Sequence, residues 1–193
     1  MRTAKTVLTV IQERGKQKKP IERVYKLLFN RELYLNAYAK LYPNNGAMTK
    51  GVTDETVDGM SIQKIDRMIE ILREEKYQWK PARREYIKKK NGKKRPLGIP
   101  VWGDKVLQEV MRQILEAYYE PQFSEHSHGF RPNRGCHTAL QEIQVWKGTR
   151  WFIEGDISQY FDTIDHKILL EILARNIHDG RFIRLVSNML EAC

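Results

Sequence analysis

The segment with the strongest fold signal reads Phe152-Ile153-Glu154-Gly155-Asp156-Ile157-Ser158-Gln159-Tyr160-Phe161-Asp162. Its aromatic and β-branched beginning predicts a short buried strand over Arg150–Gly155. A carboxylate at the end of such a strand is well placed to hold Mg²⁺, because this ion takes oxygen ligands and keeps waters for a phosphate substrate. Asp156 is therefore a candidate metal ligand. Capping of the following helix is the alternative role for this residue.

Helical periodicity dominates the rest of the chain. Apolar residues recur at three- and four-residue steps, which predicts helices over 21–41, 61–76, 104–119, 136–146, 166–175 and 180–192. Ser61 is a suitable N-cap for the second of these helices, and Pro121 ends the third. The segment 42–60 is rich in turn residues and predicts a long ordered loop.

A β-hairpin is predicted by Asn91-Gly92, which lies between the arms Arg84–Lys89 and Lys94–Ile99. The segment 80–95 carries nine cationic residues against the single acid Glu85. Alternate residues of a strand share a face, so several of these cations are expected to point together toward a phosphate chain or a triphosphate. A solvated, Lys-rich turn without a ligand is the alternative.

The charge is unevenly distributed along the chain. The 34 Lys and Arg residues outnumber the 24 Asp and Glu residues, which gives a net charge of +10. Residues 1–100 hold 24 basic and 11 acidic residues, a net charge of +13, whereas residues 101–193 hold 10 and 13, a net charge of −3. A clustered basic surface favours a polyanion such as nucleic acid, because binding releases condensed counterions. A basic face that only keeps the protein in solution is the alternative.

The composition favours an intracellular protein without a membrane segment. No apolar run reaches the ~18 residues that a membrane-spanning helix needs, and no signal peptide is expected at the N-terminus. The two cysteines, Cys136 and Cys193, have no metal-ligand spacing. A pair this sparse does not predict a disulfide framework, so a reducing compartment fits.

Several ordered motifs resemble the reverse transcriptases that bacterial group II introns encode. The segment from Asp156-Ile157 to Phe161-Asp162 resembles the first catalytic-aspartate motif of reverse transcriptases. Three further stretches are similar to the intron-encoded group in particular: Tyr86-Ile87 through Arg95-Pro96-Leu97-Gly98-Ile99-Pro100, His128-Gly129-Phe130-Arg131-Pro132, and Phe161-Asp162-x-x-Asp165-His166. The turn-rich segment 45–61 is similar to that family's N-terminal extension. Motifs in the correct order are far more specific than any one of them.

The resemblance implies an α+β fold of the right-hand polymerase type. Residues 1–60 would form a basic, helical N-terminal extension of the fingers, and residues 61–150 would form the fingers. Residues 151–193 would form the start of the palm, with the first catalytic aspartate motif.

The resemblance also implies roles for individual residues. Asp156 and the backbone carbonyl of Ile157 match ligands of the catalytic Mg²⁺ ions, of which the complete enzyme uses two. Lys89 and Arg95 match residues that contact the triphosphate of the incoming deoxynucleotide. The ring of Phe161 matches the residue that blocks a ribose 2′-hydroxyl.

The implied activity is RNA-directed DNA synthesis, combined with binding of the group II intron RNA as a splicing maturase. The substrates would be an RNA template with a DNA primer and deoxynucleoside triphosphates, without a membrane partner, and a homodimer is left open. The loop 129–132 would help to shape the template and nucleotide pocket. The side chains expected to contact RNA are Lys18, Lys19, Arg23, Lys26, Arg83, Arg84, Lys88 and Arg131. The implied location is the bacterial cytoplasm, with nucleoid association during action on DNA.

One departure from the family pattern changes the expected activity. The family's second aspartate pair, in a Tyr-Ala-Asp-Asp hairpin, has no counterpart, because no aspartate follows Asp179. Two-metal catalysis needs ligands for both ions, so we expect a fragment that binds RNA but does not polymerise. A non-catalytic RNA-binding module is one alternative. A reverse transcriptase of another lineage, from a retron or a diversity-generating element, is a second, and the long extension at 20–61 argues against it.

Overall fold

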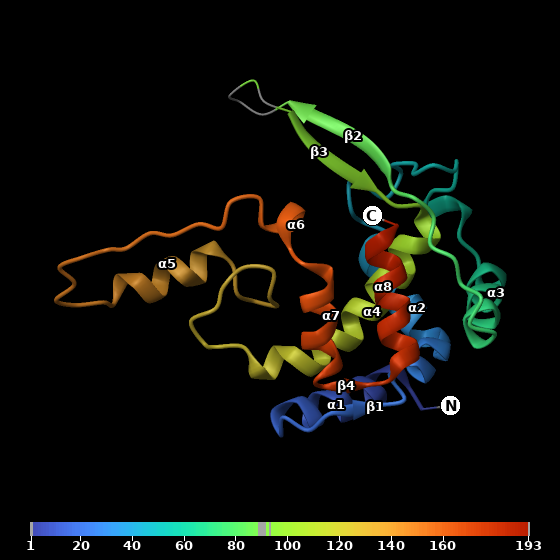
Figure 1. Ribbon diagram of the computed structural model, residues 1–193, viewed down its shortest axis with the longest axis horizontal. Helices are drawn as coiled ribbons and strands as arrows, with labels where there is room; N and C mark the ends of the chain where they lie inside the picture. Colours follow the sequence, from blue (N-terminus) through green and yellow to red (C-terminus); the bar gives the residue numbers. More distant parts are fainter. Residues whose placement is uncertain (1, 89–91, 93, 193) are drawn as a thin grey trace.

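The computed structural model describes residues 2–88, 92 and 94–192 (Figure 1). Its α-helices are α1 (Ala4–Lys16), α2 (Arg31–Leu41), α3 (Ile62–Arg73), α4 (Trp102–Tyr119), α5 (Cys136–Gln144), α6 (Tyr160–Thr163), α7 (His166–Ala174) and α8 (Gly180–Glu191). Short 3-10 helices are η1 (Val24–Phe29), η2 (Val57–Gly59) and η3 (Glu120–Gln122). Within these residues, two separate two-stranded sheets are formed by β1 (Ile21–Glu22) with β4 (Ile177–His178) and by β2 (Arg83–Lys88) with β3 (Lys94–Ile99). This mixture agrees with the predicted α+β class.

The hydrophobic core is built around α4. Its inward face repeats with the helical period and is buried at Val106, Val110, Ile114 and Tyr118. Helices α1 and α2 pack against α4 (Figure 1). The same core contains side chains from both ends of the chain, among them Val24, Leu28, Leu33, Tyr34, Ile177, Phe182 and Leu185. One core therefore draws residues from all three parts of the predicted division into extension, fingers and palm.

The short parallel sheet joins the two ends of the chain. Ile21 of β1 pairs with Ile177 of β4, and both side chains are buried. Next to this pair, the backbone N–H of Tyr25 donates to the carboxylate of Asp179 over 2.9 Å. The start of α8 is thus fixed to the N-terminal elements.

The helix predicted over 21–41 is wrong in its first half. Residues 21–22 form a strand, 24–29 form a 3-10 helix, and only Arg31–Leu41 is α-helical. The break is at Asn30, whose side-chain oxygen accepts a hydrogen bond from the N–H of Glu32 over 3.0 Å and caps α2. A short polar side chain that bonds to nearby backbone favours a cap over a helix interior. Apolar periodicity alone does not show this boundary.

Helix α1 is not predicted by the sequence pattern, because its apolar content is low. It is held by a very close approach to α4: a Cβ atom built on Gly15 would lie 2.1 Å from the carbonyl oxygen of Tyr118. The hydroxyl of Tyr118 donates to the carbonyl of Lys19 over 3.0 Å. Tertiary packing therefore stabilises α1 more than helix propensity does.

The short helix α6 is not predicted by the sequence pattern, whereas the other remaining helices and the hairpin confirm the sequence predictions. The hydroxyl of Ser61 accepts from the N–H of Lys64 over 3.2 Å and caps α3. Pro121 lies two residues after the end of α4, in η3. Strands β2 and β3 are antiparallel, with Lys88 opposite Lys94. The segment between α2 and α3 is a loop that contains η2, as expected.

The buried strand predicted over 150–155 is a further error. This segment has no regular structure, and Trp151, Phe152 and Ile153 are 87%, 70% and 93% exposed. A strand needs a neighbour to satisfy its backbone hydrogen bonds. Across residues 2–88, 92 and 94–192 no strand pairs with it. Residues 150–155 therefore have the composition of a strand, but among the described residues they lack the neighbouring strand that a sheet requires.

No helix in the described part of the chain combines the length and the apolar character needed to cross a membrane.

Candidate nucleic-acid and nucleotide interface

The hairpin sorts its side chains onto two faces. Side chains alternate along a strand, and directly opposed residues share a face. By the strand register, the face that we call the inner face carries Arg83, Glu85, Ile87, Arg95, Leu97 and Ile99. The face that we call the outer face carries Arg84, Tyr86, Lys88, Lys94, Pro96 and Gly98.

The inner face contacts the body of the protein near the base of the hairpin. Nε of Arg83 donates to the carbonyl of Lys50 over 3.1 Å, and the same guanidinium pairs with Glu85 at 2.7 Å. Leu97 and Ile99 are half-buried on this face. By contrast, every residue of the outer face is exposed.

The register also separates the predicted contacts. Arg95, the predicted triphosphate contact, is exposed on the inner face. Arg84 and Lys88, predicted to contact RNA, lie on the outer face. Lys89, the predicted companion of Arg95, lies outside the described residues. The hairpin therefore carries Arg95 on its inner face and Arg84 and Lys88 on its outer face, so these cations point in opposite directions.

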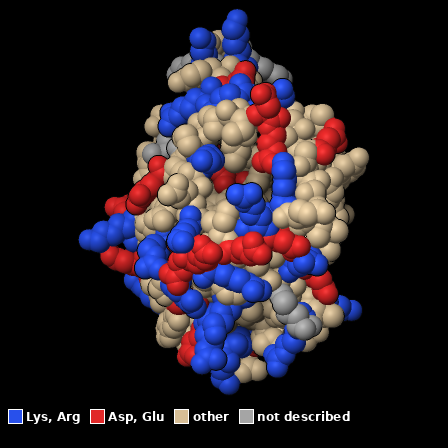
Figure 2. All heavy atoms as spheres, turned by 90° about the vertical axis from the view of Figure 1, so that its right-hand side faces the viewer, with Lys and Arg blue, Asp and Glu red and all other residues tan. Residues whose placement is uncertain are grey.

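The predicted RNA-binding cations near the N-terminus, Lys18, Lys19, Arg23 and Lys26, are all exposed. Lys18 and Arg23 have left-handed backbones, with φ of 51° and 53°. At Lys18 this conformation ends α1, and the N–H of Lys19 bonds back to the carbonyl of Arg14 over 3.0 Å. Figure 2 shows Lys and Arg gathered at the bottom of the molecule, at the level of α1 and β1 in Figure 1, and again on the hairpin at the top.

The loop between α4 and α5 is organised around Arg131. Its guanidinium pairs with Glu120 at 2.9 Å and donates to the carbonyl oxygens of Ser124 and Ser127 over 2.7 Å each. Only 8% of the Arg131 side chain is exposed. In this structure the side chain therefore holds the loop together, and an RNA contact by Arg131 stays a prediction. Phe130, next to it, is fully exposed and has a φ of 55°.

Glu142 of α5 fastens the other end of this loop. Its carboxylate contacts Nδ1 of His126 and lies 2.9 Å from Nε2 of His128. Nδ1 of His128 lies 2.9 Å from the hydroxyl of Thr138. The hydrogen bonds with His128 and His126 lower the pKa of the Glu142 carboxyl from its ordinary value. An ionised carboxylate therefore ties the loop to the helix.

Asp156 lies in the exposed segment between α5 and α6. Ile157 is 66% exposed, and Phe161 of α6 is 73% exposed. The Asp156 carboxylate and the Ile157 carbonyl are oxygen donors of the type that Mg²⁺ takes. In the described part of the chain, no three His, Cys, Asp or Glu side chains come together as a metal-binding group. These two donors fit a part of a magnesium shell and not the whole of it.

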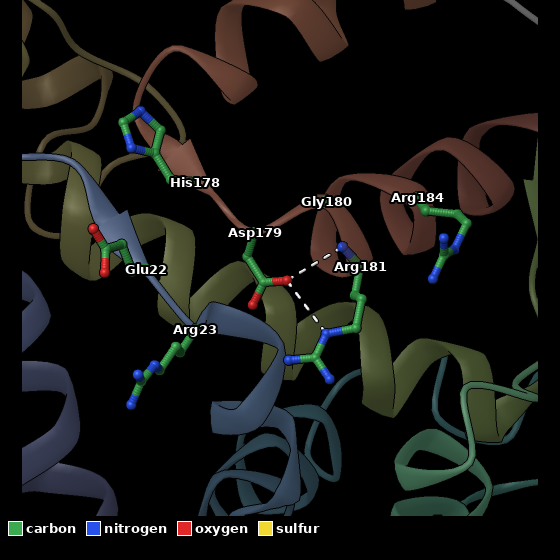
Figure 3. A pocket seen from close by; sticks show the side chains of 7 residues that line it. All are labelled: Glu22, Arg23, His178, Asp179, Gly180, Arg181 and Arg184. Carbon is green, nitrogen blue, oxygen red and sulfur yellow. Dashed lines mark hydrogen bonds and ion pairs between the residues drawn. The ribbon is translucent and has the colours of Figure 1, made fainter.

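A pocket that the sequence motifs do not indicate lies between β1 and the start of α8 (Figure 3). It has a volume of about 530 Å³ and is lined by Glu22, Arg23, His178, Asp179, Gly180, Arg181 and Arg184. Arg181 and Arg184 both pair with Glu75, at 3.5 and 2.6 Å. Two arginines of this pocket, Arg181 and Arg184, are therefore paired with an acidic residue of the protein. The sequence does predict a helix from Gly180, but local patterns cannot show what faces its first turn.

Comparison with known proteins places these features in one family. Residues 87–190 match the family described as reverse transcriptase (RNA-dependent DNA polymerase). The chain is 49% identical over 172 residues to the group II intron-encoded protein LtrA of Lactococcus lactis subsp. cremoris, which covers 88% of this chain and 29% of the relative. It is 38% identical over 183 residues to protein YkfC of Escherichia coli K12, which covers 89% of this chain and 48% of the relative. Nuclear intron maturase 1 of Arabidopsis thaliana is 36% identical over 93 residues, 48% of this chain and 13% of that protein. The chain thus spans less than half the length of these relatives.

Proposed function

Because this chain belongs to the reverse transcriptase family, we propose that it forms the fingers and the beginning of the palm of a group II intron-encoded reverse transcriptase. The observation that carries this proposal is the family match over residues 87–190, which contains both strand β3 with Arg95 and the segment with Asp156. The parent protein would copy RNA into DNA and would bind its intron RNA as a splicing maturase. Relatives that are named as an intron-encoded protein and an intron maturase support this lineage over a retron or a diversity-generating element.

The exposed segment 150–157 supports a palm that continues beyond this chain. Trp151, Phe152 and Ile153 expose most of their surface to water, which is unusual for adjacent large apolar residues. We propose that strands from another part of a longer parent pair with this segment and bury these side chains. In the isolated chain the same surface would favour self-association into a homodimer.

The nucleotide site would be formed by residues of the hairpin on one side and by Phe161 of α6 on the other. Arg95, whose planar guanidinium matches phosphate oxygens, would bind the triphosphate of a deoxynucleotide together with the point charge of Lys89. The exposed ring of Phe161 would lie against the sugar and exclude a 2′-hydroxyl. Both Arg95 and Phe161 are accessible for these roles.

Asp156 and the carbonyl of Ile157 would hold Mg²⁺. A bound ion would polarise a phosphoryl oxygen during DNA synthesis. The two donors provide part of one coordination shell, so the site would be completed by carboxylates from another part of the parent. The isolated chain is accordingly proposed to be inactive in synthesis.

RNA binding is the function that the isolated chain is best equipped to perform. The exposed N-terminal cations lie beside core residues such as Ile21, Val24 and Leu28, and the hairpin cations lie on paired strands, whereas among the described residues the segment around Asp156 has neither a strand partner nor buried residues. This contrast favours a second candidate for the chain by itself, a non-catalytic module that docks on structured RNA. The parent would act in the bacterial cytoplasm and on nucleoid DNA.

The experiment that tests the proposal replaces Asp156 by Asn in the longer parent. The substitution keeps the side-chain volume and removes the charge that would hold Mg²⁺. We expect DNA synthesis on an RNA template to be abolished, while the affinity for RNA stays nearly unchanged, because one distant carboxylate contributes little to a basic surface. Synthesis at the wild-type rate in this variant would reject the catalytic role of Asp156.

A further inference from the structure

We propose that His128 is a positioning residue for DNA synthesis, which holds the loop between α4 and α5 in place by donating hydrogen bonds from both nitrogens of a positively charged imidazolium ring. This inference rests on the proposed function in one respect, because the loop can affect DNA synthesis only if the parent is a reverse transcriptase. It assigns a role to a residue outside the candidate metal and triphosphate sites.

The tip of this loop has a strained backbone. Gly129, Phe130 and Asn133 have φ angles of 84°, 55° and 57°. Glycine adopts this left-handed conformation readily, whereas a bulky aromatic residue does so only where its surroundings impose it. The ring of Phe130 is fully exposed, so packing of that ring does not offset the strain. Strain of this kind is typical of functional loops, and the contacts that impose it are candidates for positioning residues.

The loop is anchored on both sides of its tip. Arg131 fixes the following residues through its ion pair with Glu120. His128 directly precedes the tip and contacts Glu142 and Thr138 of α5. Only 13% of the His128 side chain is exposed. His128 therefore links the strained tip to α5.

The hydrogen bonds of His128 require a proton on each ring nitrogen. The ionised Glu142 carboxylate can only accept, so Nε2 of His128, 2.9 Å away, donates to it. The Thr138 hydroxyl has a single hydrogen, which it donates to the carbonyl of Gly135 over 2.8 Å. The Thr138 oxygen then accepts from Nδ1 of His128 over 2.9 Å. With a neutral ring, the hydroxyl would have to turn away from Gly135, so only the imidazolium satisfies all three contacts at once.

The charges around the ring support this assignment. The ionisable groups of the loop and of the elements beside it are Glu120 of η3, Glu125, His126, Arg131 and Arg134 of the loop, and His137 and Glu142 of α5. Arg131 pairs with Glu120, and Arg134 donates to the carbonyl of Glu125, so both guanidinium groups are engaged away from His128. The positive N-terminal end of the α5 dipole disfavours a nearby cation, but the Glu142 carboxylate in direct contact with the ring offsets this effect.

The first test detects the ring protons of His128 by NMR spectroscopy. The full 193-residue chain is labelled with ¹⁵N-histidine, and the signals of its five histidines are assigned by single substitutions. At about pH 7, where an ordinary imidazole is mostly neutral, both ring nitrogens of His128 are expected to carry a proton. Thr138→Val replaces the hydroxyl by a methyl group and is expected to leave a proton on Nε2 alone. Thr138→Ser keeps the hydroxyl and is expected to retain the wild-type signals.

The second test measures DNA synthesis by the longer parent at varied deoxynucleotide concentration. At about pH 7, Thr138→Val is expected to raise KM for the nucleotide by about 2- to 10-fold, the range for one net hydrogen bond, with a smaller change in kcat. The ratio of this KM to the wild-type value is expected to fall toward one at about pH 9, because the ring is then neutral in both proteins. A purely structural effect of valine would persist at every pH. Thr138→Ser is expected to restore the wild-type constant.

The matched control for both tests is Thr9→Val. It removes a threonine hydroxyl that donates to the carbonyl of Lys5 over 3.0 Å within α1. The chemical change is the same as in Thr138→Val, but it lies outside the loop. This variant should leave both the His128 signals and the nucleotide constant unchanged.

The outcomes separate this inference from the proposed function. A neutral His128 ring at about pH 7 in the wild-type chain would reject the imidazolium anchor, whether or not the parent synthesises DNA. A doubly protonated ring combined with wild-type kinetics of Thr138→Val would confine His128 to the stability of the loop and reject its positioning role. If the parent synthesises no DNA, the proposed function fails together with the positioning role, whereas the ring protons still show whether the anchor exists.

Discussion

The backbone N–H of Tyr25 donates a 2.9 Å hydrogen bond to the carboxylate of Asp179, a residue 154 positions later in the chain. The other oxygen of this buried carboxylate accepts from the N–H of Arg181 over 3.2 Å and caps α8. One side chain therefore satisfies backbone donors of the N-terminal elements and of the last helix. The basic N-terminal segment is thus an integral part of the fold.

The first prediction concerns this carboxylate. Asp179→Ala should lower the free energy of unfolding by about 1–3 kcal/mol, because it leaves buried N–H groups without an acceptor and removes a helix cap. Asp179→Asn keeps one acceptor oxygen and should cost less. Urea unfolding followed by circular dichroism measures both, and equal stability of all three proteins would contradict the linking role of Asp179.

The second prediction concerns the close approach of α1 and α4. Gly15→Ala should destabilise the protein by about 1–3 kcal/mol, because the added methyl group meets the Tyr118 carbonyl and forces the helices apart. The matched control is Gly46→Ala, since a Cβ atom at Gly46 meets nothing within 4 Å. Thermal unfolding of the two variants compares them directly. A Gly15 variant as stable as the Gly46 variant would show that α1 does not pack as described.

The third prediction is a loss of stability in acid that depends on Glu142. Its hydrogen bonds with His128 and His126 lower the pKa of the carboxyl in the folded state. A group with a lowered folded pKa stabilises the fold above its unfolded pKa, about 4.3, and loses this contribution as the pH falls through the folded value. Glu142→Gln should therefore make the free energy of unfolding depend less on pH below the unfolded pKa of about 4.3. An unchanged pH profile in this variant would contradict the observed tie between the loop and α5.

These relationships show where sequence reasoning succeeds. Helices α3 and α4 have strong apolar periodicity and local boundary residues, Ser61 and Pro121, so their ends can be predicted. The hairpin follows from Asn91-Gly92, and its register then decides which face carries Arg95.

Other features depend on contacts that no local pattern contains. Helix α1 is stabilised by the fit of Gly15 against another helix, and the break at Asn30 is a cap inside an apolar repeat. The apolar run at 150–155 has the composition of a strand, but a strand also needs a neighbour, which composition cannot supply. The motif predicts an RNA contact for Arg131, but it cannot show that the Arg131 guanidinium pairs with Glu120 within the loop.

The fourth prediction uses the two faces of the hairpin in the longer parent. Arg95→Ala should raise the apparent nucleotide constant about tenfold or more, since loss of a charge-assisted contact costs about 1.5–3 kcal/mol. Arg84→Ala removes the same charge from the opposite face and should leave this constant unchanged. Steady-state incorporation at varied deoxynucleotide concentration distinguishes them. If the two substitutions raised the apparent nucleotide constant equally, the positive charge of the hairpin would matter for nucleotide binding and the position of Arg95 on the inner face would not.

The most direct measurement is extension of a DNA primer on an RNA template, in parallel for this 193-residue chain and for the longer parent. We expect that both bind the template, that the parent extends the primer when Mg²⁺ is present, and that the isolated chain does not extend it. Extension by the isolated chain would contradict the view that Asp156 and Ile157 hold only part of the metal site. Failure of the parent to extend the primer would contradict the assignment of this chain to an active reverse transcriptase.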